Sequence, residues 1–290
     1  MSNAPRLLLS LRSLHGPSLA TRDRLLEVVA RYREPESLAV TLAKAVAAKV
    51  DGVFTCSTPA LRAALAELSS EVPLYVVLPS VSEYERQELG AGIEPVIDAS
   101  RARARGSARM AAQLAGLWRP AMFARGDYSW RLPVLIESEL AGLPRRSVRG
   151  VVLDAWFTDL ALAAGNKRMF ESFTRHVRKR LHLSAGLETR NLGTLLAQLR
   201  EWDIAPDFVA GPVNPSGLLM KPSPEELLAE LRRGFVPVVG RELCAGGVDS
   251  LDAAAEFAYS HGVHGLAPDL TEMDDVGAEL RALIREGARS

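Results

Sequence analysis

The chain has 290 residues, of which 48% are hydrophobic, and its 35 Lys and Arg residues are balanced by 35 Asp and Glu residues. This length and apolar content suffice for one large core, and the zero net charge argues against a chain-wide attraction to nucleic acid or acidic membranes, so we expect neither partner. The two cysteines, Cys56 and Cys244, form no CxxC motif, which argues against disulfides and structural zinc and favours a reducing, cytoplasmic compartment.

Short apolar runs alternate along the chain with stretches of helical periodicity. The first run, Leu7–Leu11, ends at Arg12 and is too short for a signal-peptide core or a membrane span. The runs that we interpret as strands are 7–11, 52–55, 74–78, 151–154, 183–188, 208–211, 236–240 and 265–267. Amphipathic helices are expected near 37–50, 58–68, 167–180, 191–202, 224–233, 250–260 and 273–286.

The alternation of strand and helix indicates parallel strands, and eight strands predict a (β/α)8 TIM barrel formed by one domain, residues 1–290. Residues 80–147 are predicted to form a mostly helical insertion between the third and fourth strands. Its arginines and aromatic residues are typical of a solvated helix face or a subunit contact, so a homo-oligomer is compatible with the sequence. The alternative fold is an open doubly wound sheet, but the turn at 14–17 lacks the GxGxxG pattern typical of that fold.

Active sites of (β/α)8 barrels lie at the C-terminal ends of the strands. Asp154 and Glu188 end the adjacent fourth and fifth strands, so we expect their carboxyl groups to face one cavity as an acid–base pair or as ligands of a divalent metal. Either residue could instead cap its own loop. His15, in the turn after the first strand, is a third catalytic candidate because histidine titrates near neutral pH, although a plain turn histidine fits equally well. Predicted substrate-binding residues at the same face are Arg12, Thr55, Asn191, Asn214, Arg241 and Glu242.

Three other features at this face have simpler interpretations. Cys56 and Cys244 end strands, but buried thiols are commonly inert. The Gly-rich segment 245–248 is typical of phosphate sites, yet acidic residues in the following loop oppose an anion. Lys221 is the only lysine in a position to reach the barrel centre and form a Schiff base. A solvent-exposed position for its charged side chain is the simpler interpretation.

The segment DGVFTCSTP, residues 51–59, resembles the strand and turn of transaldolase-type aldolases, which use a Thr-Asn-Pro turn. Cys56 and Ser57 depart from that pattern, and the Schiff-base lysine of that family has no counterpart here. The C-terminal half from Phe208 to Met273 resembles the last strands of aldo-keto-reductase-like barrels. That family binds the NADPH phosphate with basic residues after the eighth strand, where this chain is acidic, so we expect no NAD(P) cofactor.

These observations predict a lyase or isomerase of aldolase type that acts on a small-molecule substrate through carboxylates at the barrel mouth. Two alternatives stay open. One is a barrel that binds ligands without catalysis, because a fold does not imply a function. The other is an oxidoreductase on an aldo-keto-reductase-like barrel.

Overall fold

The computed structural model of the chain describes residues 4–15, 18–78 and 132–287. Eight parallel strands form one sheet in the order β1 to β8, and isolated bridges from Leu7 to Leu266 and from Ser10 to Asp269 join the last strand to the first. The strands are β1 (Leu8–Ser10), β2 (Gly52–Cys56), β3 (Leu74–Leu78), β4 (Val148–Leu153), β5 (Ser184–Glu188), β6 (Phe208–Pro212), β7 (Val238–Arg241) and β8 (Gly265–Leu266). The predicted (β/α)8 barrel is therefore confirmed.

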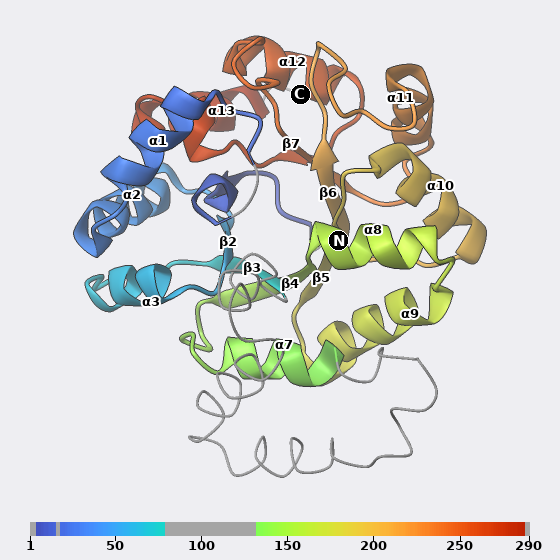
Figure 1. The fold of residues 1–290 in the computed structure, drawn as a ribbon, viewed down its shortest axis with the longest axis horizontal. Helices are drawn as coiled ribbons and strands as arrows, with labels where there is room; N and C mark the ends of the chain where they lie inside the picture. The colour runs from blue at the N-terminus through green and yellow to red at the C-terminus, as the bar shows by residue number, and fades with distance from the viewer. Residues whose placement is uncertain (1–3, 16–17, 79–131, 288–290) are drawn as a thin grey trace.

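The helices lie around the central strands (Figure 1). They are α1 (Arg22–Arg31), α2 (Pro35–Ala48), α3 (Pro59–Ala66), α7 (Leu132–Leu140), α8 (Ala155–Ala163), α9 (Lys167–Arg175), α10 (Leu192–Trp202), α11 (Pro224–Arg233), α12 (Leu251–Ser260) and α13 (Val276–Gly287). Shorter turns are η1 (Arg12–Leu14), the π-helical η3 (His176–Leu181) and η4 (Leu270–Glu272). Within the described part of the chain, no helix is both long and apolar enough to cross a membrane.

Two helices were not predicted. α1 has a single buried residue, Val28, although Leu25, Val28 and Val29 follow a helical spacing, so its sequence does carry a helical signal. α8 is apolar on nearly every side, with Trp156 and Leu160 more than half exposed, so its periodicity is weak. Residues 80–131 of the predicted insertion lie outside the described residues, and α7 is the helix described in its last part. The single-domain organisation stays a prediction.

Alternation along the strands separates two apolar layers. One layer lies inside the barrel and includes Phe54, Cys56 and Phe208, while the other, including Val53 and Val209, packs against the helices. Successive side chains of a strand point to opposite faces of the sheet. The register of each strand therefore decides which of its polar side chains reach the barrel interior.

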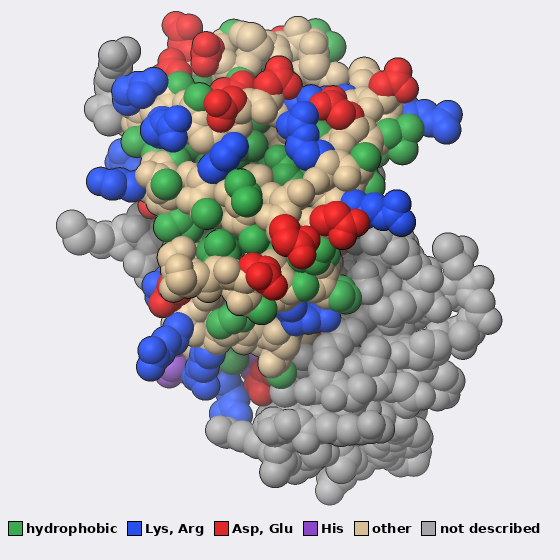
Figure 2. All heavy atoms as spheres, turned by 90° about the vertical axis from the view of Figure 1, so that its left-hand side faces the viewer, with side chains coloured by type: hydrophobic (Ala, Val, Ile, Leu, Met, Phe, Trp, Pro, Cys, Tyr) green, Lys and Arg blue, Asp and Glu red, His purple; other side chains and the backbone are tan. Residues whose placement is uncertain are grey.

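The outer face formed by α1, α2 and α3 carries basic, acidic and hydrophobic side chains interspersed with one another (Figure 2). Arg24 and Arg31 both pair with Glu27 on α1, at 2.9 and 2.6 Å. Such exposed pairs contribute little to stability, typically about 0 to 1 kcal/mol each.

The interior layer leaves no space for a side chain at Gly186. A Cβ atom there would lie 2.5 Å from Phe208 Cζ. We expect Gly186→Ala to lower the free energy of unfolding by about 1 to 3 kcal/mol, because overpacking displaces the ring. The control is Gly277→Ala in α13, where the closest neighbour is the flexible end of Arg281 at 3.4 Å; it should be neutral or slightly stabilising. Urea denaturation checks both, and equal stability of the two variants would contradict the expectation.

Candidate functional site

Arg12 occupies the centre of the barrel mouth. It follows β1 in η1, and its side chain is 9% exposed. Its guanidinium donates to Glu188 Oε1 from Nε at 3.2 Å, to Asp154 Oδ2 from Nη2 at 3.1 Å and to Cys56 Sγ from Nη1 at 2.7 Å. One side chain from the β1 end therefore contacts the ends of β2, β4 and β5, and each of its three nitrogens has a partner.

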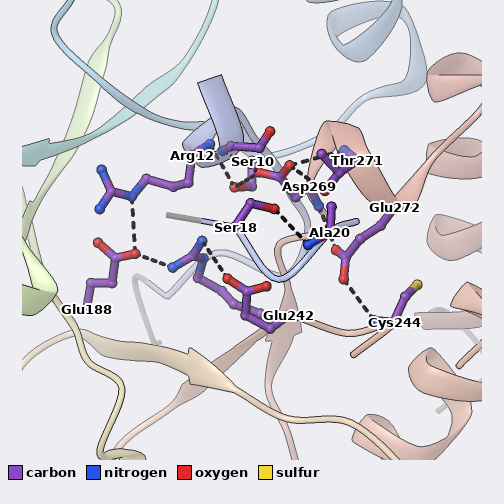
Figure 3. Close-up of polar contacts among 12 residues, drawn as sticks. Ser10, Arg12, Ser18, Ala20, Glu188, Glu242, Cys244, Asp269, Thr271 and Glu272 are labelled. Atoms are coloured by element: carbon purple, nitrogen blue, oxygen red, sulfur yellow. Dashed lines mark hydrogen bonds and ion pairs between the residues drawn. The ribbon is translucent and has the colours of Figure 1, made fainter. Parts of the chain in front are cut away.

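Glu188 ends β5 and accepts from two arginines. Its Oε1 atom accepts a hydrogen bond from Arg12 Nε (Figure 3). The same oxygen accepts another from Nη1 of Arg241, which ends β7. Burial acts to raise the pKa of Glu188, but the charges of Arg12 and Arg241 outweigh burial and lower it below the ordinary value. Glu188 is therefore ionised at neutral pH.

Asp154 has a different environment. Its Oδ1 atom accepts from Trp156 N at 2.9 Å, which caps α8, while Oδ2 accepts from Arg12. Burial and the nearby charge of Glu188 raise the pKa of Asp154, and Arg12 opposes them. Asp154 therefore caps α8 with one carboxylate oxygen and pairs with Arg12 through the other.

A cavity of about 20 Å³ opens beside Glu188, which is room for about one water molecule. Its lining consists of Arg12, Ala155, Glu188, Thr189, Arg190, Pro212, Leu219, Arg241 and Glu242. Asp154 does not belong to this lining, so the structure differs from the expectation that Asp154 and Glu188 face one cavity. The physical reason is that both oxygens of Asp154 already accept hydrogen bonds.

Glu242 is the second carboxylate of this cavity. It lies next to Arg241, with 3.9 Å between Arg241 Nη2 and Glu242 Oε1, and burial raises its pKa. Its backbone adopts a left-handed conformation with φ of 51°, which is unfavourable for a residue other than glycine. Asn214 holds this loop by donating to the Glu242 and Leu218 carbonyl oxygens at 3.1 and 3.0 Å.

A larger cavity of about 470 Å³ adjoins the first, because Glu242 lines both. Its walls come from the loop after β7, the start of α1 and the loop after β8. Its charged side chains are Arg24, Glu242, Asp249, Glu272, Asp274 and Glu279. Arg24 is already committed to the carbonyl oxygens of Thr271 and Met273 and to two carboxylates. Burial raises the pKa of Glu272, which accepts from Cys244 N and Asp269 N, to about 7.

The other predicted residues divide into two groups. Arg12, Arg241 and Glu242 meet at the small cavity as expected, whereas His15, Asn191 and Asn214 are outside its lining. His15 lies buried in the loop after β1, Asn191 precedes α10 without capping it, and Asn214 holds a loop.

The structure corrects the prediction that Thr55 faces the substrate. Thr55 shares the outward side of β2 with Val53, while Cys56 points inward to Arg12. Alternation along β2 would have given this result, since only one of two successive residues reaches the interior. Burial raises the pKa of Cys56 to about 11, so it is a neutral thiol that accepts from Arg12. Arg190 is the charged lining residue that sequence reasoning missed.

The predicted divalent metal does not fit this donor set. Among the described residues, no group of three or more His, Cys, Asp or Glu side chains is placed to hold an ion. The guanidinium of Arg12 also contacts both Asp154 and Glu188.

No protein-family model and no curated protein sequence matches the chain. An aldo-keto reductase from Bacillus halodurans, in its holo form, is similar in structure, with a TM-score of 0.52 and 11% identity over 98% of this chain and 90% of that one. A Schiff-base-forming fructose-1,6-bisphosphate aldolase gives a TM-score of 0.47 and 14% identity over 97% of this chain and 94% of that one. The resemblance to the reductase shows the barrel fold alone.

Removing Arg12 should destabilise the fold strongly. In Arg12→Met, Asp154 and Glu188 lose their shared cation, and we expect a loss of about 3 to 5 kcal/mol at pH 7. The control Arg149→Met removes an exposed pair with Glu71 and should cost less than about 1 kcal/mol.

The loss should also depend on pH. Arg12 lowers the pKa of both carboxyls, so the folded variant has higher pKa values than the wild type and binds more protons than its unfolded state does. The stability of the variant therefore rises relative to that of the wild type as the pH falls toward about 4, where carboxyl groups titrate in an unfolded chain. Urea denaturation at pH 7 and pH 5 measures the difference; an equal loss at both pH values would show that Arg12 acts by packing alone.

Proposed function

We propose that the chain is a lyase or isomerase that moves protons on a small carbonyl-containing substrate at the barrel mouth. The observation that carries this proposal is that Glu188 and Glu242 line one cavity with Arg241 beside both of them. Proton transfer needs a base and an acid within reach of the same substrate, and carboxyl groups are common in both roles.

The surroundings of the two carboxyls favour different roles. Glu188 accepts hydrogen bonds from two arginines and is the ionised partner, so it is the carboxyl available to accept a proton. Glu242 is half-buried, with 3.9 Å between its Oε1 atom and Arg241 Nη2, and burial raises its pKa, so it is the carboxyl of the pair that takes up a proton more readily. Neighbouring carboxyls whose environments separate their pKa values are a common arrangement for acid–base chemistry.

Asp154 acts as a positioning residue in this proposal. It fixes Arg12, which in turn fixes Glu188 Oε1. His15 has no part in the step, because it does not line the cavity. Since the donor set does not fit a metal ion, no step is routed through one.

The proposal predicts slow proton exchange on hydroxy ketones in D2O, followed by proton NMR as loss of the signal next to the carbonyl. Glu188→Gln and Glu242→Gln should each lower the rate by about 100-fold or more, because general acid–base groups contribute factors of this size. The control Glu256→Gln, on the exposed side of α12, should leave the rate unchanged. Absence of exchange by the wild type, or full exchange by Glu188→Gln, would refute the catalytic role and favour a barrel that only binds ligands.

Asp154→Asn should separate positioning from direct chemistry. Removing the negative charge of Asp154 leaves Arg12 to act on Glu188 alone, so the pKa of Glu188 falls further. We expect the acidic limb of the pH–rate profile to move to lower pH, with a smaller loss of rate than in Glu188→Gln. A profile that keeps its position would indicate that Asp154 serves only as the cap of α8.

The proposal also predicts that no nicotinamide cofactor binds. Five carboxylates and one committed arginine line the larger cavity, and this balance repels phosphate groups. A fluorescence titration with NADPH should show no saturation at micromolar concentration. Saturable binding would instead favour an oxidoreductase on this barrel.

A further inference from the structure

Basic side chains gather at the end of the barrel opposite the mouth. Segments 145–149 and 175–182 lead into β4 and β5, two neighbouring strands in which Gly150 pairs with Ser184. Because both segments precede their strands, they lie at the N-terminal face of the barrel and close to each other. Together they contain seven Arg and Lys residues, all exposed, and no Asp or Glu.

Carboxylates from other segments pair with three of these cations. Arg178 binds Asp207 through two hydrogen bonds, from Nε at 2.9 Å and from Nη2 at 2.8 Å. The other two pairs, at 2.8 and 3.7 Å, are Arg149 with Glu71 and Arg180 with Glu137. Each anion bound at this face is therefore a carboxylate, the group that the planar guanidinium of arginine matches with parallel hydrogen bonds.

Four cations remain that form no ion pair with any described residue: Arg145, Arg146, Arg175 and Lys179. Basic residues in the last turn of η3 are favoured by the dipole of that helix. The turn at 145–147 belongs to no helix, so a helix end does not account for Arg145 and Arg146. The face thus carries a local excess of positive charge on a chain whose net charge is zero.

The composition of this face favours one class of polyanion. None of the large hydrophobic side chains that are exposed in the described part lies in either segment, so the face has no group to insert into a lipid layer. Neither segment contains Phe, Tyr or Trp to stack on nucleic-acid bases. The zero net charge of the chain also gives no long-range attraction to nucleic acid or an acidic membrane. A short acidic peptide needs only the local cations.

We propose that this basic surface, defined by Arg145, Arg146, Arg175 and Lys179, binds an acidic segment of a partner protein. Carboxylates of that segment pair with the four cations as Asp207 pairs with Arg178. Exposed ion pairs are individually weak and are screened by salt, so the affinity depends on several pairs acting together and falls as salt is added. The surface lies at the opposite end of the strands from both cavities of the mouth, so the interaction does not rest on the proposed function.

Fluorescence anisotropy with the full chain and labelled peptides tests this inference. Oligoglutamate should bind, and oligoglutamine should not. The affinity for oligoglutamate should fall by about tenfold or more between about 50 and about 300 mM NaCl, because screening weakens every pair. Absence of oligoglutamate binding, or equal binding of oligoglutamine, would overturn the inference. Tighter binding of a short DNA duplex or of phosphatidylserine vesicles would also overturn it, by assigning the surface to nucleic acid or to a membrane.

Charge reversal locates the binding. Arg145→Glu combined with Arg146→Glu should weaken oligoglutamate binding by about tenfold or more, since each reversal replaces an attraction with a repulsion. The matched control is Arg33→Glu combined with Lys44→Glu, which reverses two exposed cations near α1 and α2 that likewise form no ion pair among the described residues. The control should keep the wild-type affinity, and equal weakening by both double variants would contradict the assignment.

Two further measurements keep the outcome decisive. If the first double variant fails to fold, Lys179→Glu reverses a charge of the same surface and should weaken binding by about threefold. Sedimentation at low salt detects self-association, and self-association that the site variants abolish would assign the surface to a second copy of the chain and overturn the inference. Proton exchange should be unchanged in every one of these variants, so its absence in the wild type refutes the proposed function alone.

Discussion

The mouth of this barrel is organised around the buried guanidinium of Arg12. A charge at this depth is tolerated only with partners on each of its donors, and Asp154, Glu188 and Cys56 supply them from three different strands. Apolar side chains of similar volume would often give an equally stable core, so stability alone does not explain an ion cluster in this position. What the cluster provides is a carboxylate whose pKa is lowered and one of whose oxygens accepts hydrogen bonds from two arginines.

The loop after β7 adds the second element of the site. Glu242 takes a left-handed backbone conformation, and Asn214 stabilises it by bonding to its carbonyl oxygen. Strain of this kind persists where surrounding contacts hold it, and here it sets a carboxyl group between two cavities. The loops after β6 and β7 therefore act as one unit, and a change in Asn214 would reach Glu242 through the backbone.

The fold followed from the sequence because the barrel strands are buried on both sides and read as short apolar runs. Two helices were not predicted. In α1 the helical spacing of Leu25, Val28 and Val29 is a usable signal, whereas α8 has too few polar residues for a clear periodicity. Four charged residues named from the sequence, Arg12, Glu188, Arg241 and Glu242, line the small cavity, but the contacts among them were not predicted. Alternation along β2 would have separated Cys56 from Thr55. In contrast, no pattern indicates that Asp154 divides its two oxygens between a helix cap and Arg12, because that depends on distances between strands far apart in sequence.

The charge balance of the mouth constrains its chemistry further. Arg12 and Arg241 neutralise Asp154 and Glu188, so Glu242 brings one negative charge more than its buried neighbours can offset. The exposed Arg190 reduces this excess only through solvent, where the interaction is weak. The site is close to neutral when Glu242 carries a proton. Arg241 acts on both carboxyls, and its charge lowers the pKa of each.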